Sequence, residues 1–288
     1  MNRALTARDS STRASLRSAF ENLGYEVIPF KKTEEQVLAN VPKHVRLTVT
    51  ASPAKGQDAT VDLTVKLAGH GYSVAPHFSA QQVRDRAHLA ELVAVSRAAG
   101  LTEWFVVAGD APEPAGRYDG GLPLLRDLFG LQHGLDSIGV PAYPDGHTFI
   151  DPATAGQALH DKQALLGDAG VRGWVSTQLC FDPAVIRTWL QAERAAGLTL
   201  PVRLGLSAPV DRTKLLTLGM RVGVGQSLRY LKKNRRGLTG LLRSDGYDPD
   251  DLLDALEDDL APLGICGIHL FTFNQLGAAV EWQRSLAA

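Results

Sequence analysis

The stretch Trp104-Phe105-Val106-Val107-Ala108-Gly109-Asp110 decides how the chain is organised. A run of apolar residues rich in aromatic and β-branched side chains predicts a strand that is buried on both faces. The run ends at Gly109, and the carboxylate of Asp110 follows at once. A carboxylate that leaves a core must be hydrated, paired or used in chemistry. The stretch therefore predicts a buried parallel strand with a polar group at its carboxyl end.

Further segments of this kind recur along the chain, and stretches with helical periodicity separate them. The eight predicted strands cover residues 25–30, 44–50, 73–79, 103–110, 138–144, 173–181, 202–208 and 267–273. Strands that alternate with helices pair in parallel, and eight such units match a closed (β/α)8 barrel. The rival is an open doubly wound sheet, which favours a glycine-rich turn after the first strand. Pro29-Phe30-Lys31-Lys32 stands there instead and favours the barrel.

Helix boundaries are marked by capping residues. An aspartate before a proline predicts an N-cap at Asp151-Pro152, Asp182-Pro183 and Asp248-Pro249. Ser79 with Gln82 predicts a capping box. Glycines fall where helices should stop, at Gly100, Gly170, Gly197 and Gly264.

The N-terminal segment predicts one helix outside the barrel. Residues 1–24 place Leu16, Ala19, Phe20 and Leu23 on one face of that helix. Residues 25–288 then form the (β/α)8 barrel, and no linker or low-complexity segment divides them. The prediction is a single α/β domain with an extra N-terminal helix.

Composition excludes several classes of function. The 288 residues are 44% hydrophobic and carry a net charge of -1, so nothing calls for nucleic acid or an anionic membrane as a partner. Cys180 and Cys266 lie in apolar segments and are expected to be reduced thiols. No apolar run approaches the roughly 20 residues that span a bilayer, and the N-terminus lacks a signal-peptide core. We expect a cytoplasmic protein, and the oligomeric state stays open.

Polar side chains gather at the predicted carboxyl ends of the strands, where such barrels carry their active sites. Glu26 lies in an apolar strand and is a candidate general acid near neutral pH. Asp110 and Gln178 end two other strands. Plainer alternatives are an ion pair for Glu26, a turn or helix cap for Asp110 and a loop-fixing hydrogen bond for Gln178. Ordinary hydrogen-bonded histidines are the alternative for His77 and His147.

Strand ends along the chain together resemble methylenetetrahydrofolate reductase. The resemblance rests on Tyr25-Glu26-Val27-Ile28-Pro29, Pro76-His77-Phe78-Ser79, Val107-Ala108-Gly109-Asp110-Ala111-Pro112, Pro141-Ala142-Tyr143-Pro144-Asp145-Gly146-His147, Ser176-Thr177-Gln178-Leu179-Cys180-Phe181-Asp182 and Ile268-His269-Leu270-Phe271-Thr272-Phe273-Asn274. These stretches keep the family's order between residues 25 and 280.

The resemblance implies reduction of 5,10-methylenetetrahydrofolate to 5-methyltetrahydrofolate by NADH or NADPH. Glu26 would protonate N10 and open the ring to an iminium ion. Asp110 would stabilise that cation and hold the pterin, as a fixed carboxylate beside a developing positive charge lowers the barrier. Gln178 would hydrogen-bond the pterin. The residues expected to bind substrate are Thr50, His77, Tyr143 and Thr272.

Departures from the family pattern fall on its flavin contacts. Ala108 stands where an arginine holds FAD, and Lys162 is displaced from the family's lysine position. The chain is therefore most similar to a divergent actinobacterial branch that works without flavin, and direct hydride transfer from NADH in a ternary complex is the expectation. His147 and the turn of Gly223, Gly225 and Gln226 are expected to contact the nucleotide, with an ordinary loop as the alternative.

Other functions remain as rivals. One is a flavin-containing barrel oxidoreductase, either an FAD-dependent methylenetetrahydrofolate reductase or a proline dehydrogenase type. Another is a barrel that binds folate or a nucleotide without catalysis. The sequence has no His-Glu-x-x-His or Cys-x-x-Cys motif, so no metal is expected. It also lacks the Gly-x-Ser-x-Gly turn of serine hydrolases after any predicted strand.

Overall fold

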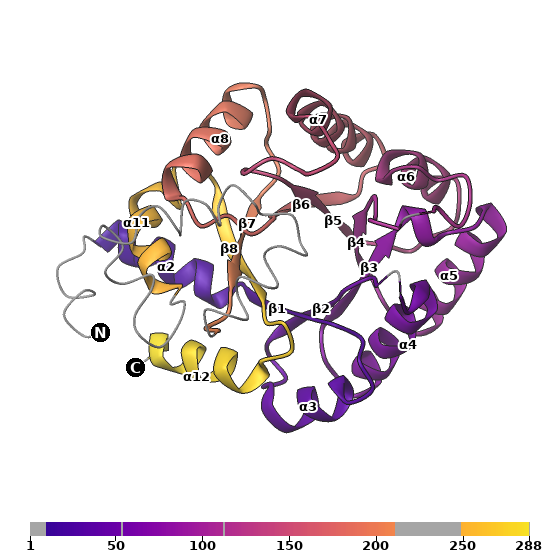
Figure 1. The fold of residues 1–288 in the computed structure, drawn as a ribbon, viewed down its shortest axis with the longest axis horizontal. Helices are drawn as coiled ribbons and strands as arrows, with labels where there is room; N and C mark the ends of the chain where they lie inside the picture. The colour runs from indigo at the N-terminus through magenta and orange to yellow at the C-terminus, as the bar shows by residue number, and fades with distance from the viewer. Residues whose placement is uncertain (1–9, 53, 112, 211–248, 288) are drawn as a thin grey trace.

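The computed structural model describes residues 10–52, 54–111, 113–210 and 249–287. Within these ranges eight parallel strands close into a barrel in chain order, and helices surround it (Figure 1). The strands are β1 (Leu23–Val27), β2 (Arg46–Val49), β3 (Val74–Ser79), β4 (Glu103–Val107), β5 (Ser137–Ala142), β6 (Arg172–Thr177), β7 (Val202–Ser207) and β8 (Ile265–Phe271). The predicted (β/α)8 barrel is confirmed, and each predicted strand overlaps an observed one.

The helices of the described residues follow the strands and cover their outer faces (Figure 1). They are α2 (Ser10–Glu21), α3 (Thr33–Asn40), α4 (Gly56–Gly69), α5 (Arg86–Ala98), α6 (Gly121–Phe129), α7 (Pro152–Asp168), α8 (Pro183–Ala195), α11 (Asp250–Leu256) and α12 (Leu276–Ala287), with short 3₁₀ turns at Ala80–Gln82 and Glu257–Asp259. Among the described helices, none has the length and apolar character needed to cross a membrane.

The extra N-terminal helix is α2, which packs against β8. Leu16 and Ala19 are buried as predicted, and the ring of Phe20 meets that of Trp282 edge to face. Leu23 does not share their helix, because α2 ends at Glu21 and Leu23 opens β1. Its side chain is buried there all the same.

Aspartate side chains cap the starts of α5, α7 and α8. The Asp151 carboxylate accepts a bond from the Thr154 N–H, and that of Asp182 accepts one from the Ala184 N–H, as predicted. The prediction of a capping box at Ser79 is wrong. Ser79 makes no capping bond, and Asp85 instead caps α5 by accepting from the His88 N–H. Asp248 lies outside the described residues.

The barrel interior is closed toward its amino-terminal end. The rings of Phe105 and Trp174 meet there at 5.1 Å, and Gly139 leaves room for them, because a Cβ on it would lie 2.3 Å from Trp174. The guanidinium of Arg203 lies over the Trp174 ring at 3.7 Å and pairs with Glu103 at 3.2 Å. These side chains form the floor of any site at the carboxyl-terminal mouth.

A buried lysine on α7 should lower the stability of the barrel. Lys162 is only 8% exposed, and burial lowers the pKa of its ammonium group to about 8. Between pH 8 and the ordinary lysine pKa, the unfolded chain therefore carries this proton while the folded chain has lost it. We expect Lys162→Met to raise the free energy of unfolding by roughly 2 kcal/mol at pH 7.

The pH dependence tests this prediction. Below pH 8 both states of the wild type carry the proton, so the advantage of Lys162→Met is fully present. It should vanish as the pH rises from about 8 to the ordinary lysine pKa near 10.4, because the amine becomes neutral in both states. Urea unfolding at several pH values measures it, with exposed Lys31→Met as the matched control. An equal effect of the two substitutions would contradict the prediction.

Candidate functional site

A carboxylate lies inside the barrel because of the alternation along β1. The hydroxyl of Tyr25 points outward and donates to the Gln283 side chain at 2.6 Å, which fixes β1 against α12. Glu26 therefore points inward, and its side chain is 14% exposed. Its Oε2 atom lies 3.0 Å from His269 Nε2 and 3.8 Å from His77 Nε2. Glu26 thus sits between two imidazoles from β3 and β8.

The two imidazoles are held by aromatic packing. The ring of Phe105 lies 4.5 Å from that of His77 and 6.0 Å from that of His269. Burial lowers the pKa of His77 to about 4, opposed by the Glu26 carboxylate and reinforced by His269. His77 is therefore neutral at physiological pH. Phe271 packs edge-on against His269 at 4.9 Å and completes the cluster.

Buried polar atoms on the barrel strands have unused hydrogen-bonding capacity. Thr48, which is paired with Glu26 across β1 and β2, is 3% exposed. Within the part of the chain that the structure describes, Thr48 Oγ1, His77 Nε2 and Ser176 Oγ have no hydrogen-bond partner. Each such atom costs folding free energy, so a native protein keeps it for a reason such as a bound ligand or water. We take these atoms to mark the polar lining of a binding site.

Replacing Thr48 tests whether its hydroxyl serves ligand binding or the stability of the fold. We expect Thr48→Val to weaken ligand binding at the mouth about tenfold, the loss of one hydrogen bond, while the free energy of unfolding stays equal or rises by up to about 1 kcal/mol. Thr60→Val is the matched control, because the Thr60 hydroxyl donates to Thr50 O at 2.8 Å. That control should lose about 1 kcal/mol in chemical denaturation. Equal destabilisation by both substitutions would show that the Thr48 hydroxyl serves the fold.

Asp110 sits on a loop that is fixed to the end of β3. Gly109 adopts φ +106°, and a Cβ there would lie 2.2 Å from Ser79 Oγ, so glycine is required. The Gln81 side chain accepts the Ala111 N–H at 3.0 Å, which anchors the residue after Asp110. The Asp110 side chain is exposed. It is therefore available to a ligand, although no direct contact joins it to Glu26.

Gln178 follows β6, with its side chain half-buried. Its backbone N–H donates to Ala142 O at 2.8 Å, and its side-chain Oε1 accepts the Leu179 N–H at 2.9 Å. The amide therefore fixes its own loop, as the plainer alternative expects. Its amide nitrogen stays available for a further bond.

Thr272 belongs to the fold and not to the ligand-binding surface. It is fully buried, and its hydroxyl donates to Glu26 O at 2.5 Å and accepts the Asn274 N–H at 3.2 Å. Asn274 has φ +58° and clamps the loop after β1, accepting the Ile28 N–H at 2.8 Å. The predicted substrate contact at Thr272 is thus replaced by a bond that positions the backbone of Glu26. Thr50 lies just past β2, half-buried.

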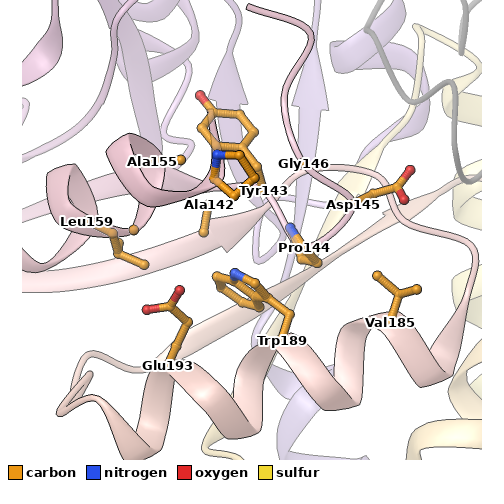
Figure 2. A pocket seen from close by; sticks show the side chains of 12 residues that line it. Ala142, Tyr143, Pro144, Asp145, Gly146, Ala155, Leu159, Val185, Trp189 and Glu193 are labelled. Carbon is orange, nitrogen blue, oxygen red and sulfur yellow. The ribbon is translucent and has the colours of Figure 1, made fainter. Parts of the chain in front are cut away.

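Two further predicted residues come from one loop. Tyr143 and His147 stack edge to face at 4.7 Å in the connection between β5 and α7, and burial raises the pKa of Tyr143 to about 12. Burial lowers the pKa of His147, while the Asp110 carboxylate opposes this, so these two groups are electrostatic neighbours. Figure 2 shows Tyr143 beside a cavity of about 330 Å³ into which Trp189 and Glu193 extend from α8.

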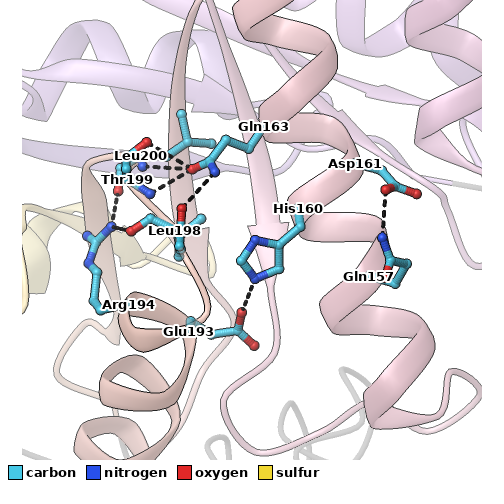
Figure 3. Close-up of polar contacts among 10 residues, drawn as sticks. Gln157, His160, Asp161, Gln163, Glu193, Arg194, Leu198, Thr199 and Leu200 are labelled. Atoms are coloured by element: carbon cyan, nitrogen blue, oxygen red, sulfur yellow. Dashed lines mark hydrogen bonds and ion pairs between the residues drawn. The ribbon is translucent and has the colours of Figure 1, made fainter.

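The walls of this cavity are fixed by polar contacts between α7 and α8. His160 pairs with Glu193 at 2.9 Å, and Gln163 accepts the Thr199 N–H at 2.7 Å (Figure 3). None of Glu26, His77 or His269 lines the cavity. Of the predicted residues that the structure describes, Tyr143 therefore lines a cavity apart from Glu26, whereas His147 lies near Asp110.

One residue of the mouth was not predicted as a site residue, and three predicted ones cannot be placed. His269 was noticed only as part of a strand motif, although its place between apolar Ile268 and Leu270 marks a polar side chain that points into the barrel. The predicted nucleotide contacts Gly223, Gly225 and Gln226 lie outside the described residues.

Comparison with known proteins supports the fold. No family model matches the chain. A protein from Clostridium thermocellum, described as uncharacterised and as binding two copies of 5-methyl-5,6,7,8-tetrahydrofolic acid, has a similar structure. It is 12% identical, with a TM-score of 0.61 over 96% of this chain and 99% of that one. Two Burkholderia cenocepacia proteins are also similar. One, provisionally described as a lyase or mutase, is 16% identical, with a TM-score of 0.48 over 96% of this chain and 86% of its own. The other, provisionally described as a phosphonomutase, is 13% identical, with a TM-score of 0.49 over 95% and 96%.

The family assignment drawn from the strand-end motifs is wrong. The Clostridium thermocellum protein, with a TM-score of 0.61, is described as binding a reduced folate and not as a methylenetetrahydrofolate reductase. Polar residues at strand ends are common to this architecture, because unrelated barrels place their sites at the same end. Short motifs at those positions therefore carry less family information than their order suggested.

Proposed function

We propose that this barrel binds a reduced folate at its carboxyl-terminal mouth, with the pterin above the aromatic floor. The observation that carries the proposal is the Glu26 carboxylate, which lies between His77 and His269. Buried polar atoms of the barrel that have no hydrogen-bond partner among the described residues support it. A mouth with an apolar floor and a few convergent polar groups is typical of sites for flat heterocyclic ligands.

The chemistry of a reduced pterin suits this lining. Its amino group and the adjacent ring N–H form a donor pair that matches a carboxylate, and the exposed Asp110 offers one. The inward carboxylate of Glu26 would then face the nitrogens that carry one-carbon groups. A barrel of the same fold, the Clostridium thermocellum protein, is described as binding two copies of a reduced folate, which supports folate as the class of ligand.

Calorimetric titration with 5-methyltetrahydrofolate tests the proposal. We expect saturable binding that tetrahydropterin competes away and that p-aminobenzoylglutamate, which lacks the pterin, does not. Asp110→Asn should weaken binding about tenfold, because the carboxylate loses charge toward the pterin edge. Asp119→Asn changes another exposed carboxylate of the same loop and should leave affinity unchanged. No heat of binding, or equal competition by both fragments, would overturn the proposal.

A second candidate function is an NADH-dependent reduction of 5,10-methylenetetrahydrofolate at the same mouth. The hydrogen bond between Glu26 and His269 favours it, because it holds a carboxyl group inside the barrel in a fixed orientation. Glu26 would protonate N10, NADH would pass its hydride to the methylene carbon, and 5-methyltetrahydrofolate and NAD⁺ would leave. In this scheme NADH or NADPH is a co-substrate and FAD takes no part.

The oxidation of NADH separates the two functions. The reductase predicts loss of NADH absorbance only when methylenetetrahydrofolate is present, at a rate that added FAD does not change. A yellow protein whose rate follows its FAD content would instead support the flavin-containing rival. Folate binding without NADH oxidation would leave the binding function and remove the reductase.

A further inference from the structure

We propose that Glu26, His77 and His269 form a binding site for one divalent transition-metal ion, with Zn²⁺ as the best match. The three residues come from β1, β3 and β8, and one donor atom from each lies within 4.8 Å of the others. The inference goes beyond folate binding and does not depend on it. Motif searches miss such a site, because its ligands are far apart in sequence.

The separations suit one shared ion. Two donors that each lie 2.0–2.2 Å from one metal are roughly 3.0–3.5 Å apart. The Glu26 oxygen is 3.0 Å from His269 Nε2 and 3.8 Å from His77 Nε2, and all three donor atoms lie within 4.8 Å of one another, so rotation of the side chains can bring them around one ion. The same Oε2 atom faces both imidazoles, which places the ion between all three side chains.

The donor types select the metal. Two imidazoles and a carboxylate suit Zn²⁺ and its first-row neighbours, whereas Mg²⁺ and Ca²⁺ prefer oxygen ligands. Three protein ligands leave a fourth position for water or substrate, as in catalytic zinc sites. His77 Nε2 is buried without a hydrogen-bond partner among the described residues, so this donor has no other use within them.

The ligands are already oriented. The buried amide of Gln57 donates to His77 O at 2.8 Å and accepts the Ser79 N–H at 2.9 Å, which fixes the end of β3. Phe105 packs against both imidazoles from the barrel floor. A set of ligands held in this way loses little conformational freedom when an ion binds.

Metal binding and proton donation by Glu26 exclude each other. A carboxylate that ligates Zn²⁺ is ionised and holds no proton to give. If the barrel is a reductase, Zn²⁺ should therefore inhibit it, and a chelator should restore its rate. If the barrel binds folate without catalysis, Glu26 donates no proton and this competition does not arise.

Titration of the chelator-treated full chain with Co²⁺ tests the site without folate. We expect one Co²⁺ per chain, with the strong visible bands of a four- or five-coordinate ion, displaced by one equivalent of Zn²⁺. His77→Gln and Glu26→Gln should each weaken binding by about 100-fold or more, since each removes a direct ligand. His160→Gln, which changes a histidine on α7, should bind as the wild type does.

A spectrum that stays that of hydrated Co²⁺ would overturn the proposal, as would bands that persist undiminished in both ligand variants. Circular dichroism and melting temperature confirm that each variant is folded. A Zn²⁺-dependent rise in the wild-type melting temperature that is absent from His77→Gln is the second expected result.

Discussion

If the barrel is the reductase of the second candidate function, replacing Glu26 with glutamine is expected to slow NADH-dependent reduction of methylenetetrahydrofolate by about 100-fold or more. Glutamine keeps the shape of the side chain and a hydrogen bond to His269, but it has no acidic proton to give to N10. The affinity for 5-methyltetrahydrofolate should change by less than about threefold, since the pterin edge is assigned to Asp110. Stopped-flow NADH absorbance gives the rate, and calorimetry gives the affinity.

The matched control removes a carboxylate outside the barrel. Glu34 on α3 pairs with His70 at 3.0 Å on the surface, and Glu34→Gln should leave both rate and affinity unchanged. Wild-type turnover by Glu26→Gln would remove Glu26 from the proton-donor role. A parallel loss of affinity and rate would show that Glu26 acts by binding the ligand.

The largest expected effect on stability comes from a glycine on β7. A Cβ at Gly205 would lie 2.0 Å from the backbone oxygen of Thr177 and 2.9 Å from the Phe271 ring. The backbone of β6 cannot give way cheaply, because Gly205 N–H also donates to Thr177 Oγ1 at 2.8 Å. We expect Gly205→Ala to lower the free energy of unfolding by about 3 kcal/mol, with a melting temperature roughly 7 °C lower.

Another glycine provides the control. Gly167 lies in α7 with nothing within 4 Å of a Cβ built on it, so Gly167→Ala should stabilise the protein by about 0.5–1 kcal/mol through helix propensity. Guanidinium unfolding with an unchanged m value measures both variants. Equal effects of the two substitutions would contradict the packing argument at Gly205.

Much of the fold was predictable from local chemistry. Each strand is a short apolar run, and α5, α7 and α8 end just before Gly100, Gly170 and Gly197, which have positive φ between +67° and +102°. Gly264 also has positive φ, but it lies in the turn between the 3₁₀ turn at Glu257–Asp259 and β8 and ends no helix. Only a residue without a Cβ enters this region easily, which is why the signal is local. The predicted capping box at Ser79 is wrong because only a short 3₁₀ turn follows Ser79, and the helix α5 begins after Asp85, which caps it.

The site was only partly predictable. Glu26 and His77 could be found, since each is a polar residue near a strand end, and the barrel brings strand ends together. His269 is also a polar residue in an apolar strand, but its contact with Glu26 depends on the pairing of β1 with β8, which local sequence does not encode. The role of Thr272 also depends on this pairing. Its hydroxyl donates to the backbone oxygen of Glu26, and only the folded structure brings these two atoms together.

A crystal structure of the protein with 5-methyltetrahydrofolate shows whether the barrel mouth is the folate site. We expect the pterin in the carboxyl-terminal mouth, with its amino edge on Asp110 and its N5 and N10 region facing Glu26 above Phe105. A folate bound in the cavity between α7 and α8, with the Glu26–His269 pair untouched by ligand, would contradict it.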